Sequence, residues 1–512
     1  FERLGSHHVD ITTRSEPAQK YFDQGIRLVY AFNHEEAVRS FEEAARLDPD
    51  PPMPYWGAAL ALGPNINAPI DRRQESRASD FIQKARARLQ HVTPRERAYV
   101  EALAKRYVPN KKKARRALDE SYVKAMREIS RQFPDDLDAA TLFAEALMDL
   151  RPWDYWKADG RPQPGTEEII TTLESVLRRG PDHPGACHYY IHAVEASLEP
   201  QRALACAKRL ADLMPGAGHL VHMPAHVYMR LGLYHDASER NERAATVDHA
   251  YLDHRPTQGM YASKYYAHNL HFLSASLTME GRSADAVHAA RKLVSTVPRS
   301  LMALDSALEL YAPTPVLTLA RFGRWSDIIR EPPPAKELRL TTGMWHFARG
   351  LAFAATTRFG SAEGELFNLK RVQKGFAKGN SAEVKIRRTL MKVTERVLTG
   401  EIAARRGRYD EGIRALKDAL RLEAELPYTE PPLWYQPVRH NLGAVFLSAG
   451  RAAEAEQVYR EDLRQNPHNG WALYGLVRSL RDQRKEDEAV QEEERLQKAW
   501  SRADVTLVAS RF

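Results

Sequence analysis

The feature that most constrains this chain of 512 residues is a repeat about 34 residues long. Residues 18–51 read as a helix, a turn and a second helix, and 53–63, 407–422, 441–459 and 470–480 follow the same phase. Small residues let two helices approach closely, and large ones fill the groove between units. In the first unit these positions are 8, 20, 24, 27 and 32, occupied by Gly25, Ala37, Phe41, Ala44 and Pro49.

The pattern, clearest in FNHEEAVRSFEEAARLDPD at 32–50, resembles the tetratricopeptide repeat family. The resemblance implies an all-α fold, a solenoid of helix-turn-helix units wound into a superhelix. No strand-like alternation of useful length interrupts the helical signal. The expected organisation is an N-terminal extension (1–17), N-terminal repeats (18–180), histidine-rich central repeats (181–298), degenerate repeats (299–425), C-terminal repeats (426–500) and a tail (501–512).

Charge and composition argue against several classes of function. The formal net charge is +8, but acidic and basic residues are interleaved, and the one dense basic run predicts a solvated helix end rather than a nucleic-acid contact. No stretch approaches the eighteen apolar residues of a membrane span. Cys187 and Cys206 favour two buried inert thiols over a disulfide. The basic run comprises Lys111, Lys112, Lys113, Arg115 and Arg116.

Histidines are concentrated in one part of the chain. Eleven of the nineteen fall within 183–271, where even scatter would place about three. Aligned on the repeat, seven of them share three positions of the first helix, and the family resemblance implies that these positions face the concave groove. We assign no role to His183, His235, His249 and His254. The seven are His219 and His268 at position 2, His188, His222 and His271 at position 5, and His192 and His226 at position 9.

The spacing of these histidines predicts a transition-metal site. Imidazoles at i, i+3 or i, i+4 share a helix face, and helices 8–10 Å apart bring two faces onto one ion. A closed set of four histidines would favour structural zinc. Three protein ligands plus a water would favour a catalytic ion, and a dinuclear centre would favour copper. The two four-ligand sets open to the chain are His188, His192, His222, His226 and His219, His222, His268, His271. A pH-sensitive or peptide-binding groove lined by histidines is the alternative.

Glu195 lies on the same helix face, seven residues after His188. It is the candidate catalytic residue, as general base toward a metal-bound water. The alternatives are that it orients a neighbouring histidine or pairs with an arginine. Tyr189 lies on this face too, Tyr228 falls in a packing position, and Trp153 stands in a loop expected at the border of the groove.

The segments HYYIHAVEAS, HLVHMPAHVYMRLG and YAHNLHF also resemble a group of bacterial tetratricopeptide proteins that are predicted to be exported. The expected function is a copper- or zinc-dependent enzyme acting on a small-molecule or peptide substrate in the groove. A non-catalytic scaffold for a partner protein is the alternative. Histidine stands where peptide-clamping members carry Lys, Arg or Asn, which favours the metal. The opening at Phe1 suggests either a removed leader or a truncated chain. A removed leader predicts a periplasmic or secreted protein, and a cytoplasmic one is the alternative.

Overall fold

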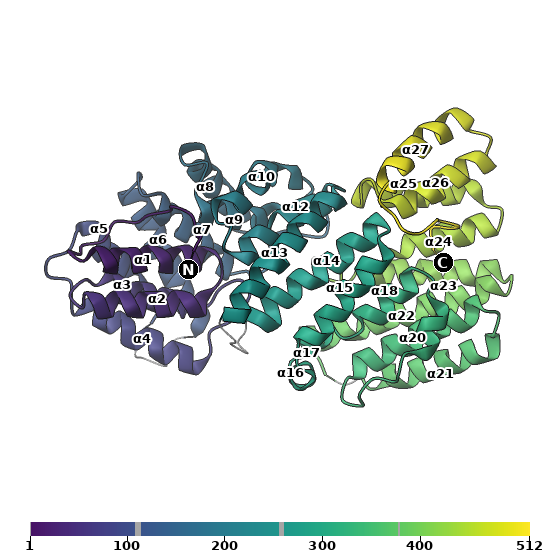
Figure 1. Ribbon diagram of the computed structural model, residues 1–512, viewed down its shortest axis with the longest axis horizontal. Coiled ribbons are helices and arrows are strands. Elements are labelled where there is room, and N and C mark those ends of the chain that lie inside the picture. Colours follow the sequence, from purple (N-terminus) through teal and green to yellow (C-terminus); the bar gives the residue numbers. More distant parts are fainter. Residues whose placement is uncertain (1, 108–113, 255–260, 377–378, 512) are drawn as a thin grey trace. The chain divides into compact units, whose positions relative to one another are not determined.

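The computed structural model describes residues 2–107, 114–254, 261–376 and 379–511. Within these ranges the secondary structure is helical, with two isolated β-bridges, Asn65–Ala68 and Trp156–Pro162, and no named strand (Figure 1). The predicted all-α, tetratricopeptide-type fold is confirmed. No helix in the described parts of the chain is long and apolar enough to cross a membrane.

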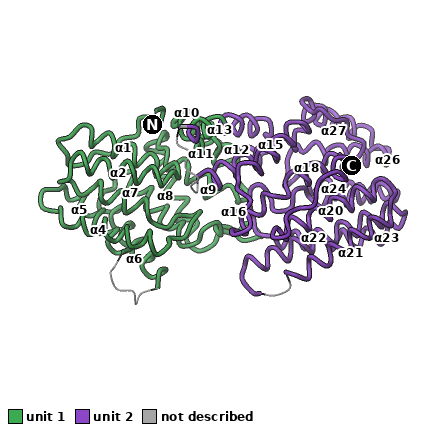
Figure 2. The backbone as a smooth tube through the Cα atoms, turned by 60° about the horizontal axis from the view of Figure 1, so that its bottom comes forward, with its two compact units in different colours: residues 1–227, 246–250 green, residues 228–245, 251–512 purple. Residues whose placement is uncertain are grey.

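The chain divides into two compact units (Figure 2). Unit 1 contains residues 1–227 and 246–250, and unit 2 contains 228–245 and 251–512. The segment 181–298, predicted as one block of central repeats, contributes to both units. Helices α12 (Pro224–Arg230) and α13 (Tyr234–His254) each have residues in both units.

Unit 1 is a series of helices joined mostly by short turns. Several begin at side chains that cap them, such as Ser15 and Thr93, which satisfy free backbone N–H groups of the first turn. The helices are α1 (Glu16–Tyr30), α2 (His34–Leu47), α3 (Met53–Ala61), α4 (Arg72–Arg86), α5 (Pro94–Ala104), α6 (Arg115–Gln132), α7 (Leu137–Asp149), α8 (Thr166–Arg179), α9 (Pro184–Val194), η1 (Pro200–Ala203), α10 (Leu204–Leu213) and α11 (Gly218–His222).

Unit 2 continues with helices of the same kind. Consecutive pairs such as α20 with α21 and α22 with α23 pack against one another. The helices are η2 (Tyr261–Tyr266), α14 (Ala267–Glu280), α15 (Ser283–Thr296), α16 (Arg299–Leu304), α17 (Ser306–Glu309), α18 (Thr314–Arg321), α19 (Trp325–Arg330), α20 (Arg339–Ala355), α21 (Phe359–Lys374), α22 (Ala382–Arg405), α23 (Tyr409–Glu423), α24 (Val438–Ser448), α25 (Ala452–Gln465), α26 (Gly470–Asp482) and α27 (Glu486–Ala499).

The small and large positions of the repeat pack as predicted. The ring of Phe41 on α2 lies between Gly25 of α1 and Gly57 of α3, where a Cβ on either glycine would stand 2.5 Å from the ring. In unit 2 Tyr459 of α25 lies in the same way between two glycines, one on α24 and one on α26. A side chain on the second helix of a repeat therefore fills a gap that two glycines leave open on the flanking first helices.

Other predictions concern single side chains. Cys187 and Cys206 are free and buried, as expected for inert thiols. Arg115 and Arg116 begin α6 and pair with Glu75 and Glu120, which fits a charged helix end. Lys111, Lys112 and Lys113 lie outside the described residues.

Candidate metal centre

The histidines of α9 are placed by the way this helix begins. His183 is the N-cap, and its Nδ1 accepts a hydrogen bond from the Ala186 N–H at 3.1 Å. Pro184 follows at the first helical position, where its missing N–H costs nothing. One helical turn then separates His188 from His192, so both rings project from one face of α9.

The second group of histidines follows a proline break. The repeat phase predicts one first helix that carries His219, His222 and His226, but the structure has α11 and α12, with Met223 at the C-cap of α11 and Pro224 at the start of α12. Pro224 has no N–H to continue the helical ladder. His222 and His226 therefore lie on consecutive short helices, and their Nε2 atoms are still only 3.0 Å apart.

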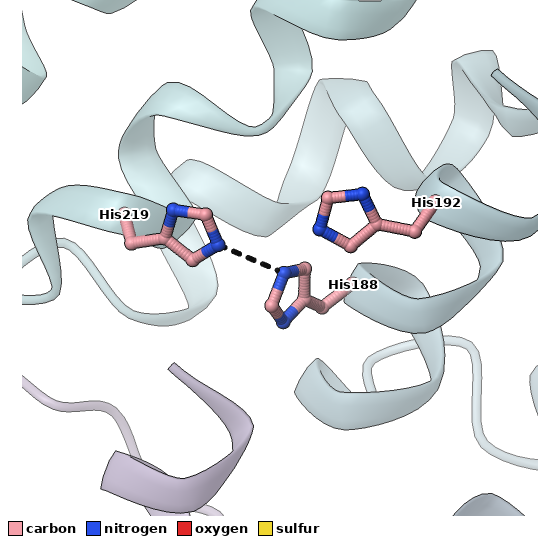
Figure 3. A group of neighbouring side chains, drawn as sticks. All are labelled: His188, His192 and His219. Atoms are coloured by element: carbon pink, nitrogen blue, oxygen red, sulfur yellow. Dashed lines mark hydrogen bonds between the residues drawn. The ribbon is translucent and has the colours of Figure 1, made fainter. Parts of the chain in front are cut away.

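Three imidazoles of unit 1 converge. His188 and His192 come from α9 and His219 from α11, and one ring nitrogen of each lies within 4.8 Å of those of the other two. Figure 3 shows the three rings turned toward one another, with His219 Nε2 3.1 Å from His188 Nε2. Their exposed fractions are 0% for His188, 2% for His192 and 5% for His219, so the group lies inside the protein.

His188 and His192 each form an outer hydrogen bond through Nδ1, so their Nε2 atoms face the group, where His188 Nε2 is bonded to His219 Nε2. His188 Nδ1 lies 2.7 Å from the carbonyl oxygen of Tyr30, which can only accept, so this nitrogen carries the proton of the neutral ring. His192 Nδ1 donates in the same way to Glu195 Oε1 at 3.2 Å. Its Nε2 is buried without a hydrogen-bond partner. Metal-binding histidines are typically oriented in this manner by a carbonyl or carboxylate behind the ring.

The electrostatics also favour the neutral rings that bind metals. Burial lowers the pKa of His188 well below its usual value, and the positive charge that His192 can carry lowers it further. Burial likewise lowers the pKa of His192, although Glu195 opposes the shift. Tetrahedral bonds of 2.0–2.1 Å place ligand nitrogens about 3.3 Å apart, close to the separation of the inner nitrogens of His188 and His219. The three residues therefore fit a transition-metal ion.

Glu195 connects this group to His226. Its Oε1 contacts His192 and its Oε2 lies 2.7 Å from His226 Nδ1. Burial raises the pKa of Glu195, but His226 and His192 outweigh it and lower that pKa to about 2. The buried carboxylate thus remains ionised, accepts a hydrogen bond from His192 and lies against the ring of His226. This contact matches the orienting alternative, and the catalytic role of Glu195 stays a prediction.

Two aromatic rings that border the group adopt unusual backbone angles. Phe32, in the turn between α1 and α2, has a φ of 56°, and its ring centroid lies 4.5 Å from that of His188 and 5.4 Å from that of His219. Trp153 has a φ of 61°, and its ring lies 5.0 Å from His192. The left-handed conformation of Phe32 belongs to the turn of the repeat, since Thr357 and Arg484 have the same conformation in the corresponding turns of later units. The repeat pattern places Phe32 in a turn but could not show that its ring contacts His188 and His219, which lie more than 150 residues away in the sequence.

A second histidine group in unit 1 is explained by hydrogen bonds. Asp138 Oδ1 lies 2.9 Å from His7 Nε2, 3.3 Å from His183 Nε2 and 2.5 Å from the Tyr30 hydroxyl. The other nitrogen of His183 already caps α9. We therefore interpret this group as a structural network that positions Tyr30, whose carbonyl oxygen accepts from His188.

The remaining predicted residues have other surroundings. His268 and His271 lie on α14 in unit 2, where their rings pack near Phe272 and Tyr311 respectively. Tyr189 is 1% exposed beside Tyr30 and Phe32, and Tyr228 is buried, so both are core side chains. His235 contacts Glu280 at 3.1 Å. The side chain of His254 lies outside the described part of the chain.

No protein-family model matches this chain, and no curated protein sequence matches it. Human IFIT1, solved as a dimer with m7Gppp-AAAA, is 11% identical, with 96% of this chain and 91% of that chain covered at a TM-score of 0.34. Yeast Tom70 is 12% identical, with 95% of this chain and 92% of that chain covered at a TM-score of 0.31. A chain of the APC/C Cut9–Hcn1 hetero-tetramer is 14% identical, with 91% of this chain and 96% of that chain covered at a TM-score of 0.29. Nothing about ligands or activity follows from such scores, and the helix pairs described above identify a tetratricopeptide-type repeat fold.

Proposed function

We propose that this chain is a tetratricopeptide-type binding protein whose unit 1 holds a transition-metal ion, zinc or copper, through His188, His192 and His219. The observation that carries the proposal is the Nε2 atom of His192, which is buried without a hydrogen-bond partner in a group of three converging imidazoles. A buried nitrogen lone pair with no donor is costly, and a bound cation removes that cost.

His222 and His226 would provide the next ligands for a larger or dinuclear centre. Their Nε2 atoms face one another at 3.0 Å, and Glu195 links His226 to His192. Burial of the whole group favours an ion that stabilises unit 1 over one that meets a substrate. Copper oxidation or zinc hydrolysis, with Glu195 as the catalytic residue, remains the prediction for an enzyme.

The test is elemental analysis of untagged protein after reconstitution with zinc or copper. The wild type should retain about one ion per chain, and His192→Ala should lose it because a ligand is missing. His346→Ala is the matched control, since His346 lies in unit 2 and bonds Glu365. Circular dichroism establishes that each variant is folded. A wild type without zinc or copper, or a His192→Ala variant that retains the ion, would overturn the proposal.

A partner-binding scaffold is the second candidate function. The observation that favours it concerns unit 2, where side chains of several helices hold a segment of the chain itself.

A further inference from the structure

The last described residues of the chain bind to the helices of unit 2. Asp504 accepts hydrogen bonds from the N–H groups of Ser283 (2.7 Å) and Ala284 (2.9 Å) at the start of α15. Leu507 is 8% exposed and packs in a cluster with Phe322 and Trp471. These contacts hold 504–507, which follow the last described helix, on α15, on α26 and at the end of α18.

The next residues make a denser set of polar contacts. Ser510 is 1% exposed, and its hydroxyl donates to the carbonyl of His440 at 2.8 Å and lies 2.7 Å from the hydroxyl of Tyr459. Its carbonyl oxygen accepts from Arg321 Nη1 at 3.4 Å. Arg511 donates to the buried carboxylate of Glu401 at 2.6 Å. Ser510 therefore contacts residues of α18, α24 and α25, and Arg511 contacts a residue of α22.

The side chains beneath Ser510 are connected by hydrogen bonds and packing. His440 is fully buried, and its Nδ1 accepts from Arg321 while its Nε2 lies 2.9 Å from Asp462 Oδ2. The Arg321 guanidinium stacks 3.7 Å from the ring centroid of Trp471. A surface whose polar groups are already oriented binds a peptide at low entropic cost.

Packing between the two glycines does not explain why residue 459 is a tyrosine with a hydroxyl group. In unit 1 the equivalent position between two glycines is filled by Phe41, which has no hydroxyl. In unit 2 the ring passes between Gly443 and Gly475, and its hydroxyl meets Ser510. The same packing position therefore also serves as a contact for the segment.

The segment fills its surroundings incompletely. Val508 is 69% exposed. Beside it lies a cavity of about 480 Å³ lined by Ala444, Leu447, Tyr474, Arg478 and residues 508–511. Such a cavity leaves room for side chains larger than those of Val508 and Ala509.

We infer that the surface formed by Arg321, Glu401, His440 and Tyr459 is a peptide-binding site, and that residues 504–511 are a tethered ligand occupying it. The ligand it takes is a peptide of a partner protein with a leucine three residues before a Ser–Arg pair, the chemistry of Leu507, Ser510 and Arg511. Glu401 selects the arginine, the Tyr459 hydroxyl and the His440 carbonyl select the serine, and the cluster around Trp471 takes the leucine. The inference is independent of the metal centre.

The test uses the full chain and a fluorescent synthetic peptide of residues 503–511. A Ser510→Ala, Arg511→Ala double variant loosens the tail and leaves the binding surface intact. It should bind the peptide at least about ten-fold more tightly than the wild type, whose own tail competes at high effective concentration. Adding Glu401→Gln should weaken that binding about ten-fold, because a charge-assisted hydrogen bond is lost. A scrambled peptide is the control for sequence.

Equal binding by the wild type and a folded double variant would overturn the inference, and so would binding unaffected by Glu401→Gln. If the double variant does not fold, Tyr459→Phe provides a second test. It preserves the packing between the glycines, so hydrogen exchange should quicken in 502–511 and stay unchanged in α22 and α24. A tail whose exchange does not change in Tyr459→Phe would also contradict the inference.

Discussion

Asp138, whose side chain is 15% exposed, shows how one largely buried carboxylate organises the residues behind the candidate metal centre. Its Oδ1 is shared by His7, His183 and Tyr30, and the Tyr30 carbonyl oxygen accepts from His188. Burial raises the pKa of Asp138, but the hydrogen bonds from His183 and His7 outweigh it, and the pKa lies well below its usual range. The folded chain therefore binds this proton more weakly than the unfolded chain does.

The depressed pKa predicts how stability depends on pH. The contribution of Asp138 is present above its unfolded pKa, near 4, and is lost as pH falls below it. Asp138→Asn should lower the free energy of unfolding at pH 7 by about 3 kcal/mol and flatten its fall between about pH 4 and 2. Urea unfolding across this range measures both. The control is Asp135→Asn, a fully exposed neighbour, and equal pH slopes in wild type and Asp138→Asn would contradict the prediction.

Among the helices, the tightest constraint is the contact between a ring and two glycines. Gly25 and Phe41 are 16 residues apart, as are Gly443 and Tyr459, so both units repeat one packing contact. Because Phe41 is fully buried, neither the ring nor the backbone has room to move away from an added methyl group.

Gly25→Ala should therefore destabilise the protein even though alanine is the better helix former. We expect the free energy of unfolding to fall by about 1 to 3 kcal/mol, because the added methyl group overpacks the contact with Phe41. Gly364→Ala is the matched control, because a Cβ at that position on α21 meets nothing within 4 Å. That variant should gain up to about 1 kcal/mol from helix propensity alone. Chemical denaturation of both variants measures the difference, and a neutral Gly25→Ala would show that the close contact relaxes.

For the molecule as a whole, the two compact units predict that a bound ion acts locally. Repeat arrays are stabilised by contacts between neighbouring helices, so an ion held by α9 and α11 stabilises those helices first. Zinc at a hundredfold excess over its dissociation constant adds about 2.7 kcal/mol to the state that binds it.

Hydrogen exchange measures this effect helix by helix. On addition of zinc or copper, amide exchange should slow in α9 and α11 of the wild type and stay unchanged in α22 and α24. His192→Ala should abolish the response. Protection in α14 as well would support the predicted role of His268 and His271, whereas protection confined to unit 2 would contradict a centre in unit 1.

Part of this fold could be predicted because a helical repeat depends on the spacing of residues that lie close together in the sequence. The period placed Gly25, Phe41 and Pro49 in register, and it put His188 and His192 on one face of a helix, since residues four apart always share a face. The i, i+3 and i, i+4 histidine pairs also predict a metal centre, and that centre stays a prediction. These features depend only on residues a few positions apart.

The tertiary structure decided what the period could not encode. Tyr30 accepts from His188 across 158 residues, Phe32 enters the histidine group from a turn, and Ser510 reaches His440 across 70. His183 and His192 lie close together in sequence, yet one caps a helix and the other presents a buried nitrogen with no hydrogen-bond partner. Local spacing sets the direction in which a side chain leaves its helix, whereas the packing of distant helices and turns determines which group it meets.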